Sequence, residues 1–207
     1  MGACRMSIRK KISEQFEKPE GLLGKLAGRI MSNENKELNE KTISMLKPKN
    51  DDDLLEVGFG PGVGIEYVCS TYPSCHVVGF DVSEEMKKQA AARNEEYINE
   101  GRVQLFHGPI ASAEKSMQFD GVYSVNSILI WKDPIADLTT IQQLMKPGAR
   151  IAITLQPHEK GADDETTEEI SKIIALYLKE ANFEQIAETI LDLKPVDAVI
   201  VTAVNPV

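Results

Sequence analysis

The chain has 207 residues, of which 42% are hydrophobic and 27% are charged. This composition is typical of one globular domain rather than a fibrous or disordered protein. Its 32 acidic and 23 basic side chains give a net charge of −9, and an acidic surface repels phosphate backbones, so we expect no nucleic-acid partner. No apolar run approaches the roughly 18 residues of a membrane span, and no signal peptide is recognisable. We therefore expect a cytoplasmic protein without a membrane partner.

The charge divides the chain near residue 50. Residues 1–50 carry 11 basic and 6 acidic side chains, a net of +5, whereas residues 51–207 carry 12 basic and 26 acidic, a net of −14. Apolar residues recur at helical spacing over 7–47, and Pro48 ends that pattern. We predict a helical N-terminal arm or lid at 1–50 and a second domain at 51–207.

From residue 51 onward, short apolar runs bounded by Gly, Asp or Pro alternate with amphipathic stretches. The expected strands are 53–58, 76–81, 103–107, 121–125 and 150–155, and the expected helices are 63–71, 83–99, 135–146 and 164–181. Such alternation is typical of a parallel sheet with helices on both faces. Two further runs, 183–193 and 198–204, have only a short turn between them and predict a C-terminal antiparallel hairpin.

The segment 54–64 reads LLEVGFGPGVG, an apolar run followed by a glycine-rich turn and the start of a helix. Glycines allow positive φ and let a ligand approach the backbone closely, and the helix start offers free N–H groups. A dinucleotide fingerprint G-x-G-x-x-G fails in every register, because Val63, Ile65 and Tyr67 occupy the third-glycine positions. The pattern instead begins with Glu56, and an acid suits a cationic ligand group better than a pyrophosphate.

The second expected strand ends at Asp81, 19 residues after Gly62. A carboxylate at the carboxyl end of a neighbouring strand can accept hydrogen bonds from both hydroxyls of a ribose. The alternative is that Asp81 caps the helix that begins near Ser83. Because the glycine loop lies upstream, we favour ribose binding.

Four segments, in this order, resemble the motifs of the class I S-adenosylmethionine-dependent methyltransferases. LLEVGFGPGVG resembles their glycine-rich first motif, GFDVSEEM their second, FDGV at 119–122 the opening of their fourth strand, and LMKPGA at 144–149 the turn before their fifth. The resemblance covers residues 50–205. It implies an α/β, doubly wound, Rossmann-like sheet of seven mostly parallel strands with a C-terminal antiparallel hairpin. It also implies S-adenosylmethionine as cofactor and methyl transfer to a small-molecule acceptor by in-line displacement.

The resemblance also implies which residues bind the cofactor. Gly58, Gly60 and Gly62 would line its methionine moiety. Glu56 would lie beneath that moiety, either near its ammonium group or ordering the loop. Asp81 would hold the ribose.

On the adenine side, the resemblance implies that Val82 and Met86 pack against the base. Backbone groups around Gly108 and Ile110 would bind its edge. The chain departs from the family at Pro109, since many relatives carry an acid there that accepts the adenine amino group.

The segment after the fourth strand, 124–131, would border the transferred methyl group. Asn126 is expected on the cofactor side, and Ser127, Trp131 and His158 are expected on the substrate side. Each has a structural alternative: helix or turn capping for Asn126 and Ser127, core packing for Trp131, and an exposed position for His158. The cysteines show no metal-ligand spacing, so we expect no metal.

Two other functions remain open at this point. An NAD-dependent oxidoreductase is disfavoured by the missing third glycine and by the terminal hairpin. A regulator that binds S-adenosylmethionine without catalysis is compatible with Pro109 and with the lack of an evident general base. The basic arm is expected to dock on the acidic domain, with phospholipid or nucleic-acid contact as its alternative.

Overall fold

The computed structural model describes residues 36–157, 162–194 and 196–207 of the chain. These residues belong to one compact unit, Glu34–Val207. Most of the predicted arm and the candidate residue His158 lie outside the described residues, so the structure says nothing of them.

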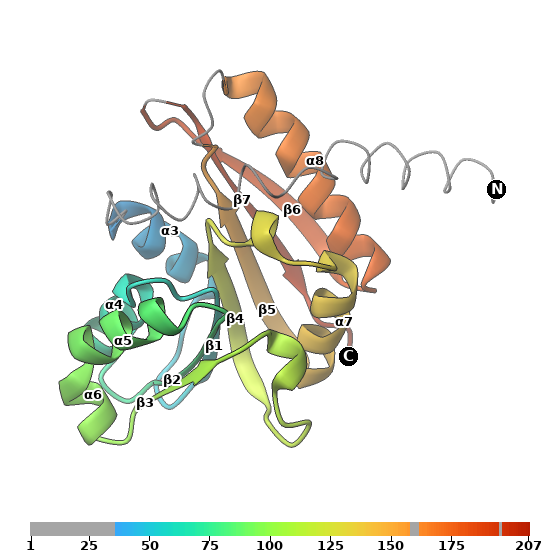
Figure 1. Cartoon of the computed structure of the whole chain (residues 1–207). Coiled ribbons are helices and arrows are strands. Elements are labelled where there is room, and N and C mark those ends of the chain that lie inside the picture. Colours follow the sequence, from blue (N-terminus) through green and yellow to red (C-terminus); the bar gives the residue numbers. More distant parts are fainter. Residues whose placement is uncertain (1–35, 158–161, 195) are drawn as a thin grey trace. The chain divides into compact units, whose positions relative to one another are not determined.

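A seven-stranded sheet forms the centre of this unit, in the order β3-β2-β1-β4-β5-β7-β6 (Figure 1). The strands are β1 Asp53–Val57, β2 His76–Asp81, β3 Val103–His107, β4 Phe119–Val125, β5 Met145–Leu155, β6 Glu184–Leu191 and β7 Ala198–Val204. The first five are parallel to one another, whereas β7 runs antiparallel to both β5 and β6. The predicted seven-stranded sheet and its C-terminal hairpin are confirmed.

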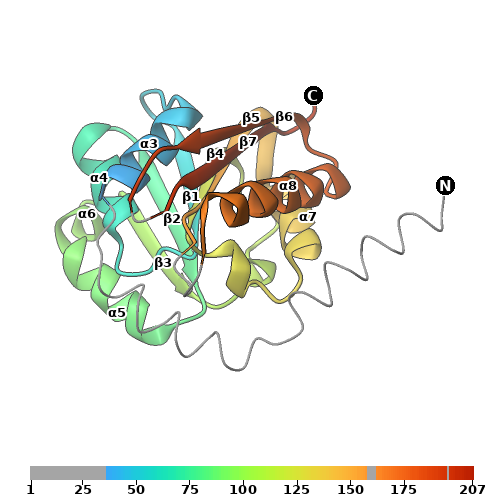
Figure 2. The ribbon, with the colours of Figure 1, turned by 90° about the horizontal axis from the view of Figure 1, so that it is seen from above.

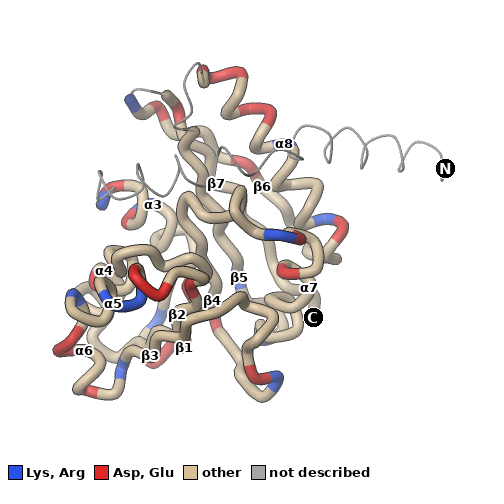
Figure 3. Tube along the Cα trace, in the orientation of Figure 1, with Lys and Arg blue, Asp and Glu red and all other residues tan. Residues whose placement is uncertain are grey.

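Helices cover both faces of the sheet, as predicted (Figures 1 and 2). They are α3 Lys36–Leu46, α4 Val63–Thr71, α5 Glu84–Arg93, α6 Glu95–Asn99, α7 Pro134–Leu144 and α8 Asp164–Glu180, with short 3₁₀ turns η1 Ile110–Ser112 and η2 Ile128–Ile130. Charged side chains lie mainly on helices and loops, and the central strands carry few (Figure 3). Within the described ranges, no helix is long and apolar enough to cross a bilayer.

Two hydrophobic cores lie on opposite sides of the sheet, because successive strand residues point to opposite faces. In β1, Leu54 packs into the core that includes Ile65 of α4, whereas Leu55 packs into the core that includes Leu138 of α7. Both leucines are at most 1% exposed. Two-sided burial explains why the central strands are continuous apolar runs. The parallel pairing of β1 with β2 places their carboxyl ends side by side, with Val57 opposite Phe80.

The single helix predicted over 83–99 is wrong, because the chain breaks at Asn94 between α5 and α6. The side-chain amide of Asn94 donates to the carbonyls of Ala90 (2.9 Å) and Gly62 (3.1 Å). The backbone at Asn94 has φ −107° and ψ 22°, which is not helical. A tertiary contact with the glycine loop therefore accompanies the end of α5.

The fifth strand begins earlier than the predicted 150–155. Met145 pairs with Phe119, and the register shifts before Gly121 pairs with Arg150. The turn-like segment around Gly148, whose φ is +78°, is accommodated as an irregularity within β5. Pairing with β4 thus extends the strand through residues that by themselves favour a turn.

Helix α3 lies within the range assigned to the arm, yet it packs against α4, β4 and β5. Leu38 and Ile43 are fully buried, and the hydroxyls of Thr42 and Thr154 lie 2.6 Å apart. The sheet unit therefore includes α3, in contrast to the predicted boundary at residue 50. A lid role for the remaining arm stays a prediction.

Candidate functional site

The glycine loop connects the carboxyl end of β1 to the first turn of α4. Gly58, Gly60 and Gly62 have φ values of +77°, +50° and +82°, a region that L side chains rarely adopt. A Cβ on Gly58 would lie 2.3 Å from the Cβ of Ser127, and one on Gly62 would lie 2.9 Å from the Cβ of Ala90. A Cβ on Gly60 would meet nothing within 4 Å. Two glycines thus permit close packing, and the middle one leaves its backbone open to a ligand.

Backbone hydrogen bonds tie this loop to the neighbouring strand. The N–H of Gly58 donates to the Phe80 carbonyl at 2.7 Å, and the N–H of Gly62 donates to the Phe59 carbonyl at 2.9 Å. The N–H of Gly60 donates to Oδ2 of Asp81 at 2.9 Å. The loop and Asp81 are therefore brought together, as the predicted topology required.

Asp81 is 7% exposed and accepts a second backbone hydrogen bond, from the Ser83 N–H to Oδ1, at 2.8 Å. Ser83 caps α5 by accepting the Met86 N–H through its hydroxyl. Burial raises the pKa of Asp81, while the two backbone hydrogen bonds and the nearby His107 act in the opposite direction. Each carboxylate oxygen has further lone-pair capacity, so anchoring the turn and accepting ribose hydroxyls are compatible roles.

Glu56 is buried beneath the loop, with 2% of its surface exposed. The Tyr123 hydroxyl donates to its Oε2 at 3.0 Å, and a Cβ on Gly64 of α4 would lie 2.8 Å from its Oε1. Burial raises the pKa of Glu56 well above its usual value, and the Asp81 charge adds to that rise, whereas the Tyr123 hydrogen bond opposes it. This position beside the first turn of α4 fits the loop-ordering alternative.

On the expected adenine side, Val82 directly follows Asp81 and is 58% exposed. Met86 lies in the first turn of α5 and is half-buried. His107, at the end of β3, places Nε2 3.1 Å from the Val82 carbonyl oxygen and Nδ1 3.2 Å from Oε2 of Glu84. The structure therefore places an exposed apolar side chain directly beside a buried carboxylate.

The loop after β3 is more constrained than the sequence suggests. The N–H of Gly108 donates to the Asp81 carbonyl at 2.8 Å, so it holds β2 rather than a ligand. Ile110 is 3% exposed and belongs to the core under α7. The carbonyl of Pro109 accepts the Ser112 hydroxyl at 2.7 Å. The Gly108 N–H and the Ile110 side chain thus stabilise the fold, whereas Pro109 between them is exposed.

The segment after β4 forms a compact polar cluster. The Ser127 hydroxyl donates to the Val57 carbonyl at 2.8 Å and lies 2.6 Å from the Ser124 hydroxyl. It also accepts the indole N–H of Trp131 at 3.2 Å. Ser127 therefore links the end of β1 to this segment, and Trp131 is held with part of its ring against the core.

Asn126 has a positive φ of +55°, which is uncommon for a residue other than glycine and concentrates at functional sites. Its backbone N–H donates to the Thr154 carbonyl at 2.9 Å, and its Oδ1 accepts the Gln156 N–H at 2.8 Å. These bonds join the carboxyl ends of β4 and β5. The second of them also fixes the orientation of the Asn126 amide.

Two functional candidates were missed from sequence, Arg93 and Asn94 at the end of α5. Nε of Arg93 donates to the Pro61 carbonyl at 3.0 Å, and Nδ2 of Asn94 donates to the Gly62 carbonyl at 3.1 Å. The sequence carried one signal, since Asn favours helix ends over helix interiors. Its target, a carbonyl 32 residues away, is visible only in the structure.

The chain is similar to known methyltransferases. Residues 54–148 match the family model described as "Methyltransferase domain". An uncharacterized methyltransferase of Bacillus subtilis, YdaC, is 37% identical over 182 residues, which cover 87% of this chain and 98% of that protein. An O-methyltransferase of Pyrenophora dematioidea is 26% identical over 129 residues, which cover 60% of this chain and 46% of that protein.

Solved structures share the fold. The N-methyltransferase NodS from Bradyrhizobium japonicum WM9, in complex with S-adenosylhomocysteine, superposes with a TM-score of 0.68 at 15% identity. The match covers 87% of this chain and 97% of that one. At this identity the likeness concerns the fold alone, and the family assignment rests on the match to YdaC.

Proposed function

Because the chain belongs to the class I S-adenosylmethionine-dependent methyltransferases, we propose that it methylates a small-molecule acceptor, with the glycine loop and Asp81 as its cofactor site. The main support for this cofactor site is the hydrogen bond between Gly60 and Asp81. The Gly60 N–H donates to the carboxylate, while the space over its Cα stays open. One ligand can thus approach both the Gly60 backbone and the Asp81 carboxylate at the carboxyl ends of the strands.

The chain's own residues divide the work of binding. Asp81 accepts hydrogen bonds from the ribose hydroxyls, and the exposed side chain of Val82 packs against adenine together with Met86. Gly58, Gly60 and Gly62 let the methionine moiety lie close to the backbone. Glu56 stays beneath the loop and orders it through the first turn of α4.

Catalysis is mainly a matter of positioning. S-adenosylmethionine supplies a methyl group already activated on a sulfonium. Holding an acceptor in line with that group can supply ~7–11 kcal/mol of the barrier. The Ser127 hydroxyl is already engaged with Val57 and Trp131, so we assign it to shaping the site rather than to proton transfer.

A small acceptor is supported by two observations. The similar protein of Pyrenophora dematioidea is described as an O-methyltransferase. In addition, residues 51–207 carry a net charge of −14, which disfavours a nucleic-acid acceptor. Of the described residues we place Trp131 beside the acceptor and keep Asn126 on the cofactor side, and His158 remains a candidate outside the described residues.

Calorimetric titration of the full chain tests the proposal. We expect S-adenosylhomocysteine to bind and NAD to give no heat of binding. Tight NAD binding without a response to S-adenosylhomocysteine would overturn it in favour of an oxidoreductase. Acceptors are then screened with labelled donor across thiols, amines, phenols and carboxylates. Binding with no transfer to any class would favour the non-catalytic regulator.

A further inference from the structure

Ordering the glycine loop into a single conformation has a high entropic cost. Three glycines with positive φ lie within five residues, 58–62, and glycine loses more conformational freedom on ordering than any other residue. A binding loop that is ordered before the ligand arrives does not subtract this cost from the affinity. The contacts that hold the loop are therefore relevant to how well the site binds.

We propose that Arg93 and Asn94, at the end of α5, are positioning residues that hold the glycine loop in its ligand-binding shape. The inference rests on the proposed cofactor site. It adds that the affinity of the site depends on two side chains outside the four sequence motifs that resemble the family.

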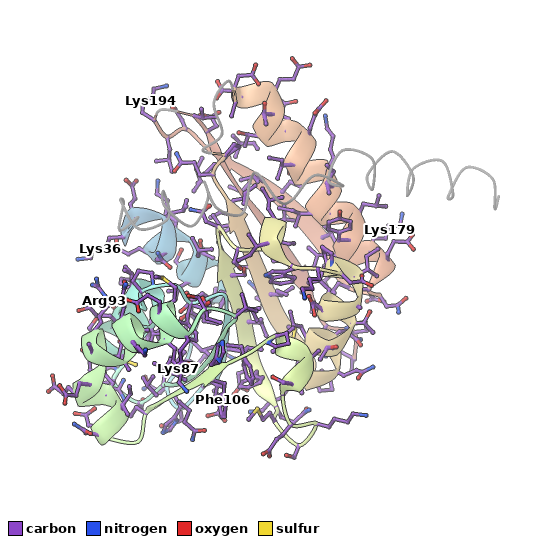
Figure 4. All side chains as sticks on the ribbon, in the orientation of Figure 1. Lys36, Lys87, Arg93, Phe106, Lys179 and Lys194 are labelled. Atoms are coloured by element: carbon purple, nitrogen blue, oxygen red, sulfur yellow. The ribbon has the colours of Figure 1, made fainter. Side chains whose placement is uncertain are left out.

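Arg93 reaches the loop from α5 and connects it to α4. Its Nε donates to the Pro61 carbonyl at 3.0 Å, and its Nη1 lies 3.0 Å from Oε2 of Glu66 in α4. Figure 4 shows Arg93 between these two helices. Its side chain is 25% exposed, so replacing it should not open a cavity in the core.

Asn94 holds the next carbonyl of the loop. Its Nδ2 donates to the carbonyls of Gly62 and Ala90, and the residue is fully buried. Its Oδ1 is buried without a hydrogen-bond partner among the described residues, and such a group destabilises a fold. Among the described residues, the amide is thus engaged through Nδ2, by one carbonyl of the loop and one of α5.

Close packing also joins the glycine loop to α5. A Cβ on Gly62 would lie 2.6 Å from Nδ2 of Asn94 and 2.9 Å from the Cβ of Ala90. The loop therefore lies directly on the last turns of α5. On its other side, Gly58 lies against Ser127, so the loop is fixed between α5 and the segment after β4, with Gly60 open between them.

Arg102 supplies a matched control. Its Nη2 donates to the carbonyls of Cys69 and Tyr72 at the end of α4, and its Nη1 pairs with Glu100. Like Arg93, it uses its guanidinium both to donate to the backbone near an end of α4 and to pair with a glutamate. It acts at the opposite end of that helix from the glycine loop.

The experiment compares Arg93→Ala, Asn94→Ala and Arg102→Ala in the full chain. Affinity for S-adenosylhomocysteine is measured by calorimetry, stability by thermal unfolding, and loop order by amide hydrogen exchange over 57–62. We expect Arg93→Ala to weaken binding about tenfold, the effect of losing one charge-assisted hydrogen bond. Its loop amides should exchange faster without ligand and regain protection at saturating ligand. The conservative Arg93→Lys should recover part of the affinity.

Arg102→Ala should lower the unfolding temperature and leave both affinity and loop exchange near wild type. Asn94→Ala should weaken binding with a smaller loss of stability, because it also removes the unpaired Oδ1. Wild-type affinity and unchanged loop exchange in Arg93→Ala would overturn the inference. Failure of the wild-type chain to bind S-adenosylhomocysteine would instead overturn the proposed site. In that case the exchange measurement on ligand-free protein still decides whether Arg93 orders the loop.

Discussion

Two carboxyl groups flank the glycine loop, and burial acts on both. Glu56 lies beneath the loop and Asp81 beside it, at 2% and 7% exposure. Burial raises the pKa of each, and the Asp81 charge adds to the rise at Glu56. Hydrogen bonds from Gly60 and Ser83 counteract the effect at Asp81. At the residue scale, the two acids therefore differ in their partners, since Asp81 accepts two backbone N–H groups and Glu56 accepts the Tyr123 hydroxyl.

The first prediction concerns Asp81→Asn. The amide keeps the size of the side chain but turns an NH₂ toward Gly60 or Ser83, whose N–H groups both need an acceptor. It also loses the charge that strengthens hydrogen bonds to ribose hydroxyls. We expect S-adenosylhomocysteine binding to weaken by about 1.5–3 kcal/mol, measured by calorimetry.

Asp120→Asn is its matched control. Asp120 also accepts a backbone N–H, that of Asp53, but at the amino ends of the strands rather than at their carboxyl ends. Its affinity should match wild type. Unchanged affinity in Asp81→Asn would mean that the ribose is held elsewhere.

The second prediction concerns pH and Glu56. Its usual pKa is 4.5 and its pKa in the folded protein is raised well above that value. The folded state therefore binds more protons than the unfolded state at pH values between the two. Stability from this group is fully present below pH 4.5 and is lost as pH rises toward the folded pKa, by up to about 1.4 kcal/mol per pH unit.

Glu56→Gln removes this titration. We expect its free energy of unfolding in urea to fall less steeply with rising pH than that of wild type. Asp81 contributes a slope of the same sign and remains in both proteins, so the difference reports Glu56 together with its coupling to Asp81. Parallel pH profiles for the two proteins would contradict the prediction.

At the element scale, the β1–α4 loop combines positions that cannot accept a side chain with one that can. Gly58 and Gly62 are closely packed, whereas Gly60 faces open space. Gly101, in the turn before β3, has a φ of +77° and also faces open space. Gly60 and Gly101 thus both combine a positive φ with room for a Cβ, but only Gly60 lies in the β1–α4 loop.

The third prediction compares alanine substitutions at Gly60 and Gly101. Gly60→Ala and Gly101→Ala should each lose about 1–2 kcal/mol of stability, because an L residue is forced into positive φ. Only Gly60→Ala should weaken S-adenosylhomocysteine binding, since its Cβ would occupy the space through which the ligand approaches. Equal affinities in the two variants would place the ligand away from this loop.

At the scale of the whole molecule, the sheet and its helices form the unit Glu34–Val207. Helix α3 completes one of its cores with Ile43 and Leu46. The charge difference that marked the sequence at residue 50 therefore does not mark the edge of this unit. The net charge of a segment describes its surface, whereas the limits of a compact unit follow its buried apolar contacts.

The fourth prediction follows from this boundary. A chain that begins at Glu34 should unfold in a single cooperative thermal transition, within a few degrees of the corresponding transition in the full chain. A chain that begins at residue 51, without α3, should be strongly destabilised, because it exposes the side chains that Leu38 and Ile43 cover. Equal stability of the two fragments, measured by calorimetric scanning, would show that α3 is dispensable.

Strand positions and the ends of β1 and β2 were predictable from sequence because their signals are local. Apolar runs, glycines and Asp81 act within a few residues of themselves. The break at Asn94 and the early start of β5 were not, since each depends on a partner distant in sequence, Gly62 for one and Phe119 for the other. The fixed position of Gly108 was likewise decided by its bond to the Asp81 carbonyl.

By itself, the sequence determined the sheet class, the terminal hairpin and the family motifs, because hydrophobic periodicity and turn residues are properties of short segments. Tertiary structure alone decided which groups are engaged and which are open. It buried Glu56, occupied the Ser127 hydroxyl and brought Arg93 to the loop. The physical reason is that hydrogen-bond partners and burial depend on contacts between residues far apart in the chain, which no local pattern encodes.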